Sequence, residues 1–233
     1  MAEKCKVYII GFGPGDPELM TVKADRILHQ SQVIIYDDLI NKDALNKYKA
    51  EKIYVGKRKG LHSKNQEEIN QIIYKYALEK NIVVRLKGGD PMIFGRGGEE
   101  YQYLKQKAVE VDIIPGITSA LAAAAYAAIP LTNRGISSSV AFCTGHPEKS
   151  IIIPNTDTIV FYMAASNINI IIDKLIESGR LPNTPIALIE NISMPEQQIV
   201  IGMLNDIIPK ANMLNSPLLI IVGEVVKLNY KID

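Results

Sequence analysis

Short runs of β-branched and aliphatic residues alternate with longer helical patterns through the first half of the chain. Five such runs predict strands: Lys6–Gly11, Val33–Tyr36, Ile53–Val55, Val83–Leu86 and Val111–Ile114. Between them, residues 21–30, 66–76 and 98–107 have the apolar spacing of helices. Strands that alternate with helices in this way predict βαβ units and a parallel sheet.

The second half of the chain has a different composition. Pro115-Gly116 interrupts the alternation, and the alanine-rich run Ala120–Leu131 then predicts a tightly packed helix. Five further runs predict strands: Ser139–Thr144, Thr158–Tyr162, Pro185–Ile189, Gln197–Ile201 and Leu218–Val222. We therefore expect two α/β domains, residues 1–114 and 115–233.

Two of the predicted helices carry end signals in the sequence. Ser63 and Gln66 have the spacing of a capping box, which predicts that a helix begins there. Asn167 is a candidate N-cap for a helix over residues 167–178, and Gly179 is a candidate stop.

Composition excludes several classes of partner. The 233 residues are 47% apolar and 22% charged, with a net charge of +1, so no overall field attracts nucleic acid or a membrane surface. Cys5 and Cys143 are far apart and follow no metal-ligand spacing. Because the N-terminus lacks a signal-peptide pattern and the most apolar run is too short to span a bilayer, we expect a cytoplasmic protein.

The first predicted strand ends in the glycine-rich turn GFGPGD, residues 11–16. Such a turn, with an acid such as Asp37 about twenty residues later, is typical of dinucleotide sites. However, Pro14 has no N–H for a pyrophosphate, and Asp16 replaces the last glycine of that motif with a negative charge. The turn instead suits a ligand of positive or mixed charge, such as a sulfonium that carries an amino acid.

A second glycine-rich stretch, LKGGDPMIFGRGGEE, covers residues 86–100 at the end of another predicted strand. Ligands of open α/β sheets bind at such strand ends. Gly88 and Gly89 let a ligand approach the backbone closely, and Asp90 offers a carboxylate to hydroxyl or amine donors. Taken alone, GGD also fits an ordinary strand-to-helix turn, but the full stretch predicts a binding site.

Cations are concentrated in the loop GKRKGLHS, residues 56–63, after the third predicted strand. This loop is either a solvated surface loop or an anion site, and its position at the same sheet edge as the glycine-rich turns favours the latter. Arg96 and Arg134 are further candidates. A small substrate with several carboxylates fits these residues better than a nucleic acid does.

Few residues are candidates for chemistry. Asp37, at the end of the second predicted strand, either caps a turn or accepts a proton from a substrate. His29 and His146 have no partners at metal-ligand spacing, so we expect no metal. No serine or cysteine stands in a nucleophile elbow.

Four long strings resemble the uroporphyrinogen-III C-methyltransferases of the tetrapyrrole methylase superfamily. They are GFGPGDPELMTVKA (11–24), VGKRKGLHSKNQEEIN (55–70), RLKGGDPMIFGRGGEE (85–100) and PGITSALAAAAYAAIPLT (115–132). GPGDP is shared across the superfamily, whereas the second and third strings are typical of a narrower group. The resemblance covers nearly the whole chain.

The resemblance implies an enzyme that uses S-adenosyl-L-methionine and releases S-adenosyl-L-homocysteine. Its substrate would be uroporphyrinogen III, methylated to precorrin-1 and then precorrin-2 on the route to sirohaem or cobalamin. It also implies a parallel N-terminal sheet, a mixed C-terminal sheet, an active site in the cleft between the two domains and a homodimer. The many carboxylates of the substrate agree with the basic residues.

The resemblance also implies roles for individual residues. It implies cofactor contacts at nine positions: Pro14, Gly88, Gly89, Asp90, Ile93, Thr118, Ser119, Met163 and Ile192. Asp37 corresponds to a proton acceptor and Lys57 to a proton donor, although Lys57 also fits as a clamp for a carboxylate. Substrate contacts are expected at five positions: Arg58, Lys59, His62, Arg96 and Arg134.

The sequence departs from the family pattern at four positions. Asp38 stands where arginine is frequent, Asn133 where histidine is common, Met92 where phenylalanine is frequent, and Ile192 where glycine is often found. Three alternatives follow. A later corrin-ring methylase is disfavoured by the basic loop, and a relative acting on protein or RNA should lack the intact GGDPMIFGRGGEE string. The third is a catalytically inactive tetrapyrrole-binding protein.

Overall fold

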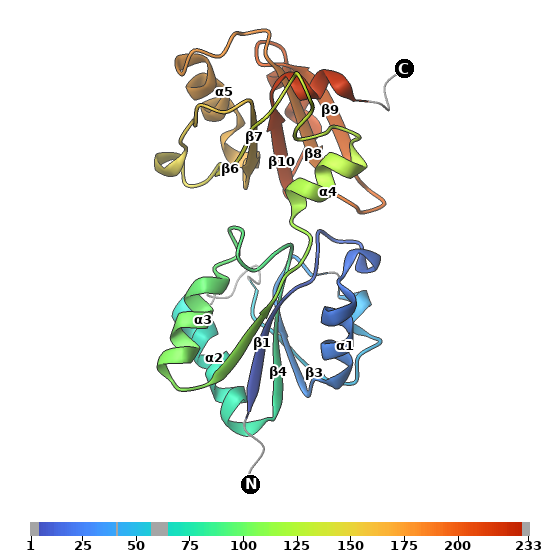
Figure 1. Cartoon of the computed structure of the whole chain (residues 1–233), viewed down its shortest axis with the longest axis vertical. Coiled ribbons are helices and arrows are strands. Elements are labelled where there is room, and N and C mark those ends of the chain that lie inside the picture. The colour runs from blue at the N-terminus through green and yellow to red at the C-terminus, as the bar shows by residue number, and fades with distance from the viewer. Residues whose placement is uncertain (1–4, 41, 57–64, 230–233) are drawn as a thin grey trace. The chain divides into compact units, whose positions relative to one another are not determined.

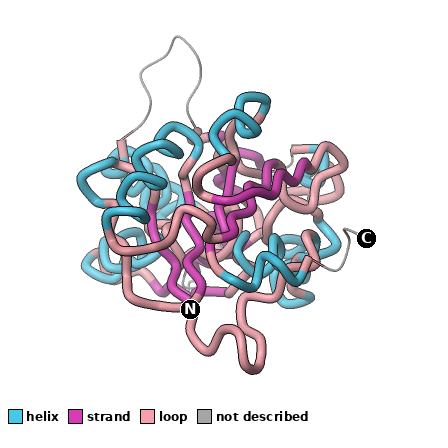
Figure 2. The backbone as a smooth tube through the Cα atoms, turned by 90° about the horizontal axis from the view of Figure 1, so that it is seen from above, coloured by secondary structure: helices cyan, strands magenta, loops and turns pink. Residues whose placement is uncertain are grey.

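The computed structural model describes residues 5–40, 42–56 and 65–229. Contacts divide the chain into two compact units, here called the N-terminal unit (Met1–Thr118) and the C-terminal unit (Ser119–Asp233). Each unit contains one five-stranded sheet with helices packed beside it (Figure 1). Helical and loop segments surround the strands (Figure 2).

The N-terminal unit has a parallel sheet, as predicted. Its strands and helices are β1 (Lys6–Gly11), α1 (Val22–Gln30), β2 (Val33–Tyr36), β3 (Glu51–Tyr54), α2 (Gln66–Glu79), β4 (Ile82–Lys87), α3 (Gly97–Gln106) and β5 (Glu110–Ile114). The strand order is β3-β2-β4-β1-β5, and each neighbouring pair is parallel. All carboxyl ends of these strands therefore lie at one edge.

Alternating side chains of this sheet fill two separate cores. In β1, Val7 and Ile9 pack with the side chains of α2 and α3, whereas Ile10 packs with those of α1. Figure 1 shows α1 on one side of the sheet and α2 with α3 on the other. The near-continuous apolar runs in the sequence follow from this burial on both faces.

The C-terminal unit has a mixed sheet, which confirms the expected fold class. Its strands and helices are α4 (Ser119–Tyr126), β6 (Val140–Thr144), β7 (Thr158–Tyr162), α5 (Ile168–Glu177), β8 (Pro185–Glu190), β9 (Gln198–Met203), α6 (Ile207–Lys210) and β10 (Leu218–Val222). The order is β6-β7-β10-β8-β9, with β6 and β7 parallel and the remaining pairs antiparallel. Three apolar residues of α5, Ile171, Ile172 and Leu175, pack in its main core.

The helix ends correct three details of the sequence prediction. The capping box of α2 is made by Asn65 and Glu68, so the predicted pair of Ser63 and Gln66 is wrong. Asn167 does precede α5, but its side chain makes no cap and donates to the Gly145 carbonyl at 2.7 Å. The alanine-rich helix ends at Tyr126, well before the expected residue 131.

Among the described residues, no helix is both long and apolar enough to cross a membrane.

Candidate active site

The carboxyl edge of the N-terminal sheet brings together the predicted functional turns. Because all five strands are parallel, the turns after β1, β2, β3 and β4 leave from this edge. These turns contain, in order, Pro14, Asp37, Gly56 and the pair Gly88-Gly89. The edge thus unites glycine-rich backbone with an acid, as the sequence analysis expects.

Three glycines, Gly11, Gly89 and Gly116, form a close backbone contact at this edge, here called the glycine junction. A Cβ on Gly116 would lie 2.3 Å from the Gly89 carbonyl oxygen, and a Cβ on Gly11 would lie 2.5 Å from the same atom. Gly89 has φ +66° and exchanges two backbone hydrogen bonds with Gly13, of 2.7 and 3.2 Å. No side chain fits here, so three turns lie together with only backbone atoms between them.

Asp90 fastens two of these turns to each other. Its Oδ1 accepts a hydrogen bond from the Met92 N–H at 2.8 Å, and its Oδ2 accepts one from the Gly116 N–H at 3.0 Å. The sequence predicts that Asp90 binds a ligand, whereas these two hydrogen bonds between turns become visible only in the structure. An ionised carboxylate has about four acceptor sites, so each oxygen retains capacity for a ligand donor.

The turn after Asp90 has an unusual backbone. Phe94 and Arg96 have φ of 52° and 59°, which is uncommon for residues other than glycine and costs about 1–3 kcal/mol each. Arg96 binds Glu99 through two hydrogen bonds, Nε to Oε1 at 2.9 Å and Nη2 to Oε2 at 2.6 Å. Hydrogen bonding from Arg96 lowers the pKa of Glu99. Arg96 is therefore exposed but already paired, and a substrate carboxylate would compete with Glu99.

A group of four charges lies next to this edge, here called the charge network: Asp37, which is partly exposed, and the buried residues Arg85, Lys87 and Glu100. The Glu100 Oε1 accepts from Arg85 Nε at 3.2 Å and from Lys87 Nζ at 2.9 Å, and Arg85 Nη2 donates to Asp37 Oδ2 at 2.8 Å. Arg85 and Glu100 side chains are 3% and 0% exposed, so solvent does not screen these pairs. Burial lowers the pKa of Lys87.

Arg85 and Glu100 were not predicted as site residues from the sequence, and Lys87 was predicted only as part of a turn. One signal was available, because Arg85 is a cation between the apolar residues Val84 and Leu86 in the strand IVVRLK. A charge at such a position needs a buried partner. The partner, Glu100, lies one turn into α3 and could not be identified from spacing alone.

Asp38, one of the four departures from the pattern that the sequence resembles, follows Asp37 in the chain. Its Oδ1 accepts a hydrogen bond from the Tyr54 hydroxyl of β3. The acid thus has a structural partner within the sheet.

The predicted residues of the C-terminal unit lie at strand ends as well. β7 and β8 both run antiparallel to β10, so Met163, after β7, and Ile192, after β8, lie at the same edge of this sheet. Met163 has φ +54° and is half exposed, whereas Ile192 is buried. The Ala120 N–H, next to Ser119, donates to the Tyr162 hydroxyl at 3.3 Å, which brings the start of α4 to the same region.

Arg134 lies in a small hairpin turn of the C-terminal unit. Asn133 and Ser137 pair through two backbone hydrogen bonds of 2.9 Å, and Arg134 is exposed between them. The remaining predicted cations and histidine, Lys57, Arg58, Lys59 and His62, lie outside the described residues.

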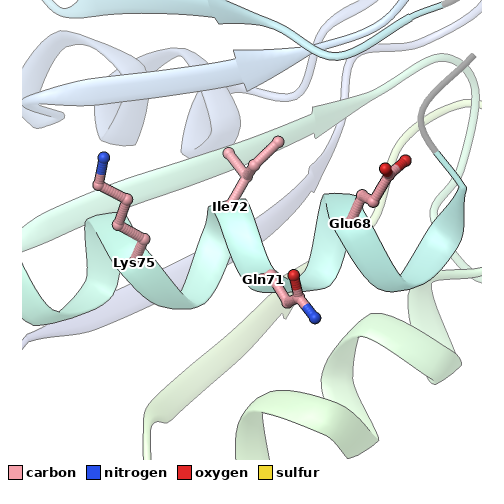
Figure 3. A pocket seen from close by; sticks show the side chains of 4 residues that line it. All are labelled: Glu68, Gln71, Ile72 and Lys75. Atoms are coloured by element: carbon pink, nitrogen blue, oxygen red, sulfur yellow. The ribbon is translucent and has the colours of Figure 1, made fainter. Parts of the chain in front are cut away.

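A depression on the outer surface of α2 is separate from the residues named above. It is lined by Glu68, Gln71, Ile72 and Lys75, which follow one another along α2 (Figure 3). It contains no residue that the sequence analysis predicts to be functional. In the described part of the chain, no group of three His, Cys, Asp or Glu residues could hold a metal ion.

A parallel sheet whose glycine-lined carboxyl edge carries acids is typical of α/β proteins that bind a small organic ligand at that edge. Comparison with known families specifies the class. A family model described as Tetrapyrrole (Corrin/Porphyrin) Methylases matches residues 6–208, and the chain belongs to this family.

Individual relatives agree with this assignment. The chain is 45% identical to a uroporphyrinogen-III C-methyltransferase of Bacillus subtilis, over 98% of the chain and 93% of the relative. It is also 45% identical to a siroheme synthase of Pseudoalteromonas atlantica, of which it spans 52%. A crystal structure of the uroporphyrin-III C-methyl transferase from Thermus thermophilus complexed with S-adenyl homocysteine has a TM-score of 0.85 and 38% identity, covering 96% of this chain and 99% of that one.

Proposed function

We propose that the chain is an S-adenosyl-L-methionine-dependent C-methyltransferase that converts uroporphyrinogen III to precorrin-1 and then to precorrin-2. The observation that carries this proposal is the glycine junction with Asp90 beside it, at the carboxyl edge of a sheet in a tetrapyrrole methylase. The names of the Bacillus and Thermus relatives support the choice of substrate and cofactor.

The residues of this edge suit the proposed cofactor. Gly88 and Gly89 present backbone without a side chain to a ligand, and the Asp90 carboxylate has acceptor sites left for an amine or a hydroxyl. We assign Pro14, Ile93 and Thr118 of the same unit to this site. Contacts of the cofactor with Ser119, Met163 and Ile192 stay predictions from the sequence. When bound, S-adenosyl-L-methionine supplies an electrophilic methyl group and leaves as S-adenosyl-L-homocysteine.

The protein's own contribution is binding, orientation and proton transfer. The exposed cations Arg96 and Arg134, together with Lys57, Arg58, Lys59 and His62, are proposed to bind substrate carboxylates. When a substituted ring carbon attacks the methyl group, the bond between that methyl group and sulfur breaks and the macrocycle becomes positively charged. Loss of a proton from another position of the macrocycle then neutralises this charge. Asp37, whose side chain is 26% exposed at the carboxyl edge, is the proposed acceptor, and Lys57 the proposed donor.

A later corrin-ring methylase of the same family is the alternative. It would share the glycine junction, so the substrate decides between the two readings. We further propose that the enzyme works as a homodimer in the cytoplasm. Light scattering on the purified protein would test the homodimer through its molar mass.

Methyl transfer to uroporphyrinogen III tests the proposed function. Purified protein incubated with S-adenosyl-L-methionine and uroporphyrinogen III should yield a ring with two added methyl groups, as seen by mass spectrometry. Asp37→Asn should bind the cofactor normally but lose about 10²–10⁴-fold in rate, the usual contribution of one acid–base group.

Two results would contradict this account in different ways. Tight cofactor binding without methylation of uroporphyrinogen III would refute the substrate assignment. Methylation by Asp37→Asn at the unaltered rate would refute only the role of Asp37.

A further inference from the structure

Arg85 is held on every side by acceptors within the N-terminal unit. Its Nη1 donates to the carbonyls of Leu86 at 2.8 Å and Ile35 at 3.4 Å, and its Nε donates to Glu100 at 3.2 Å. Only Nη2 points to a group at the carboxyl edge, the Asp37 Oδ2 at 2.8 Å. The planar guanidinium is thus fixed by three acceptors and presents its fourth hydrogen bond in one direction.

Asp37 is held in turn by the groups around it. Its Oδ2 accepts from Arg85, and its Oδ1 accepts from the Leu39 N–H at 3.3 Å. The Asp37 side chain is 26% exposed, whereas that of Arg85 is 3% exposed, so the acid is accessible while the group that orients it is not. Among the described residues, Asp38 follows Asp37 in the chain, and Lys87 of β4 and Glu100 of α3 belong to the same charge network.

We propose that Arg85 is a positioning residue: it holds the Asp37 carboxylate in one orientation at the carboxyl edge, and Glu100 holds Arg85. This inference rests on the proposed function only in that Asp37 is the proton acceptor. Arg85 itself touches neither the substrate nor the cofactor.

Sheet stability alone does not account for a cation at this position. Replacing a whole buried ion pair with well-packed apolar residues is often neutral or stabilising, and Val84 and Leu86, which flank Arg85 in β4, are apolar and buried. Apolar residues in place of the whole buried group, Arg85, Lys87 and Glu100, could fill the same space but could not orient Asp37. The arginine guanidinium can donate to Glu100 through Nε and to Asp37 through Nη2 at the same time. It thus pairs with the buried acid and also orients the accessible one.

A double-mutant cycle on methyl transfer tests the proposal. Arg85→Lys retains the charge but not the fork, so we expect kcat to fall about 100-fold, the typical result of misplacing a catalytic group by about 1 Å. KM for both substrates should change little. In an Asp37→Asn background, Arg85→Lys should cause no further loss, because the group it positions is gone.

Additive losses in that cycle would overturn the proposal, since they would show that Arg85 acts independently of Asp37. A fall in kcat matched by the loss of folded protein, measured by circular dichroism, would likewise reduce Arg85 to a structural role. If Arg85→Lys does not fold, Arg85→Gln replaces it in the same cycle, since it removes the buried charge and keeps a donor.

A spectroscopic measurement tests the positioning role of Arg85 without an activity assay. The side-chain ¹³C carboxyl signal of Asp37, assigned by its disappearance in Asp37→Asn, should be single and narrow in the free wild-type protein. In Arg85→Lys it should move toward the averaged position of exposed aspartates. An unchanged signal would refute the positioning role, even if uroporphyrinogen III proves not to be the substrate.

Discussion

Replacing Gly116 with alanine is expected to lower the free energy of unfolding by about 2–3 kcal/mol. This is the upper part of the range of about 1–3 kcal/mol that is typical when extra atoms are forced into a well-packed site. The added Cβ would lie 2.3 Å from the Gly89 carbonyl oxygen and 2.8 Å from Gly11 backbone atoms. These are backbone atoms on both sides, so no side chain can rotate away. Urea denaturation of the purified variant, followed by circular dichroism, measures the effect.

Gly98→Ala is the matched control for this variant. Gly98 lies in α3, and the nearest atom to its added Cβ is the Met92 Cε at 3.8 Å. Alanine in a helix is favoured over glycine by roughly 0.5–1 kcal/mol, so this variant should be slightly stabilised. Equal stability of Gly116→Ala and Gly98→Ala would contradict the close packing of the glycine junction.

Glu100→Gln should cost about 3–5 kcal/mol, the range for removing one partner of a buried ion pair. One oxygen of Glu100, Oε1, accepts hydrogen bonds from all three of Arg85, Lys87 and Gln66. The Glu100 side chain is fully buried. Glutamine of nearly the same shape removes the charge and leaves two buried cations opposed only by Asp37. The loss is therefore electrostatic and not a packing defect.

The neighbouring Glu99→Gln provides the control. Glu99 also pairs with an arginine, but both side chains are more than half exposed, and such pairs contribute about 0–1 kcal/mol. Adding Lys87→Met to Glu100→Gln should recover part of the lost stability, because it removes one of the unbalanced cations. Similar losses for Glu99→Gln and Glu100→Gln would refute the charge network as an energetic unit.

The strands were predictable because a strand that is buried on both faces of a sheet is a nearly continuous run of apolar residues. Val33–Tyr36, Thr158–Tyr162 and Leu218–Val222 have the bounds that their apolar runs predict. The convergence of the turns at one edge followed from the parallel arrangement. Helix starts were less predictable, because Ser63 and Asn65 both suit an N-cap by residue type, and only the structure shows that Asn65 makes the bonds.

The candidate site was predictable in its residue types but not in its contacts. Glycines and an acid after a strand indicate a ligand, yet the approach of Gly11, Gly89 and Gly116 joins residues distant in the sequence. The pairing of Arg85 with Glu100 depends likewise on how α3 packs on the sheet. Periodicity does not fix such tertiary contacts, which explains why the charge network was missed.

Calorimetric titration with S-adenosyl-L-homocysteine tests most directly the claim that the carboxyl edge of the N-terminal unit is the cofactor site. We expect the wild-type protein to bind, and Asp90→Ala to bind at least about tenfold more weakly through the loss of a charged acceptor. Asp112→Ala is the matched control, because Asp112 belongs to the same unit but pairs with Lys6 at 2.9 Å. It should bind as the wild type does, whereas equal binding by wild type and Asp90→Ala would contradict the assignment of the site.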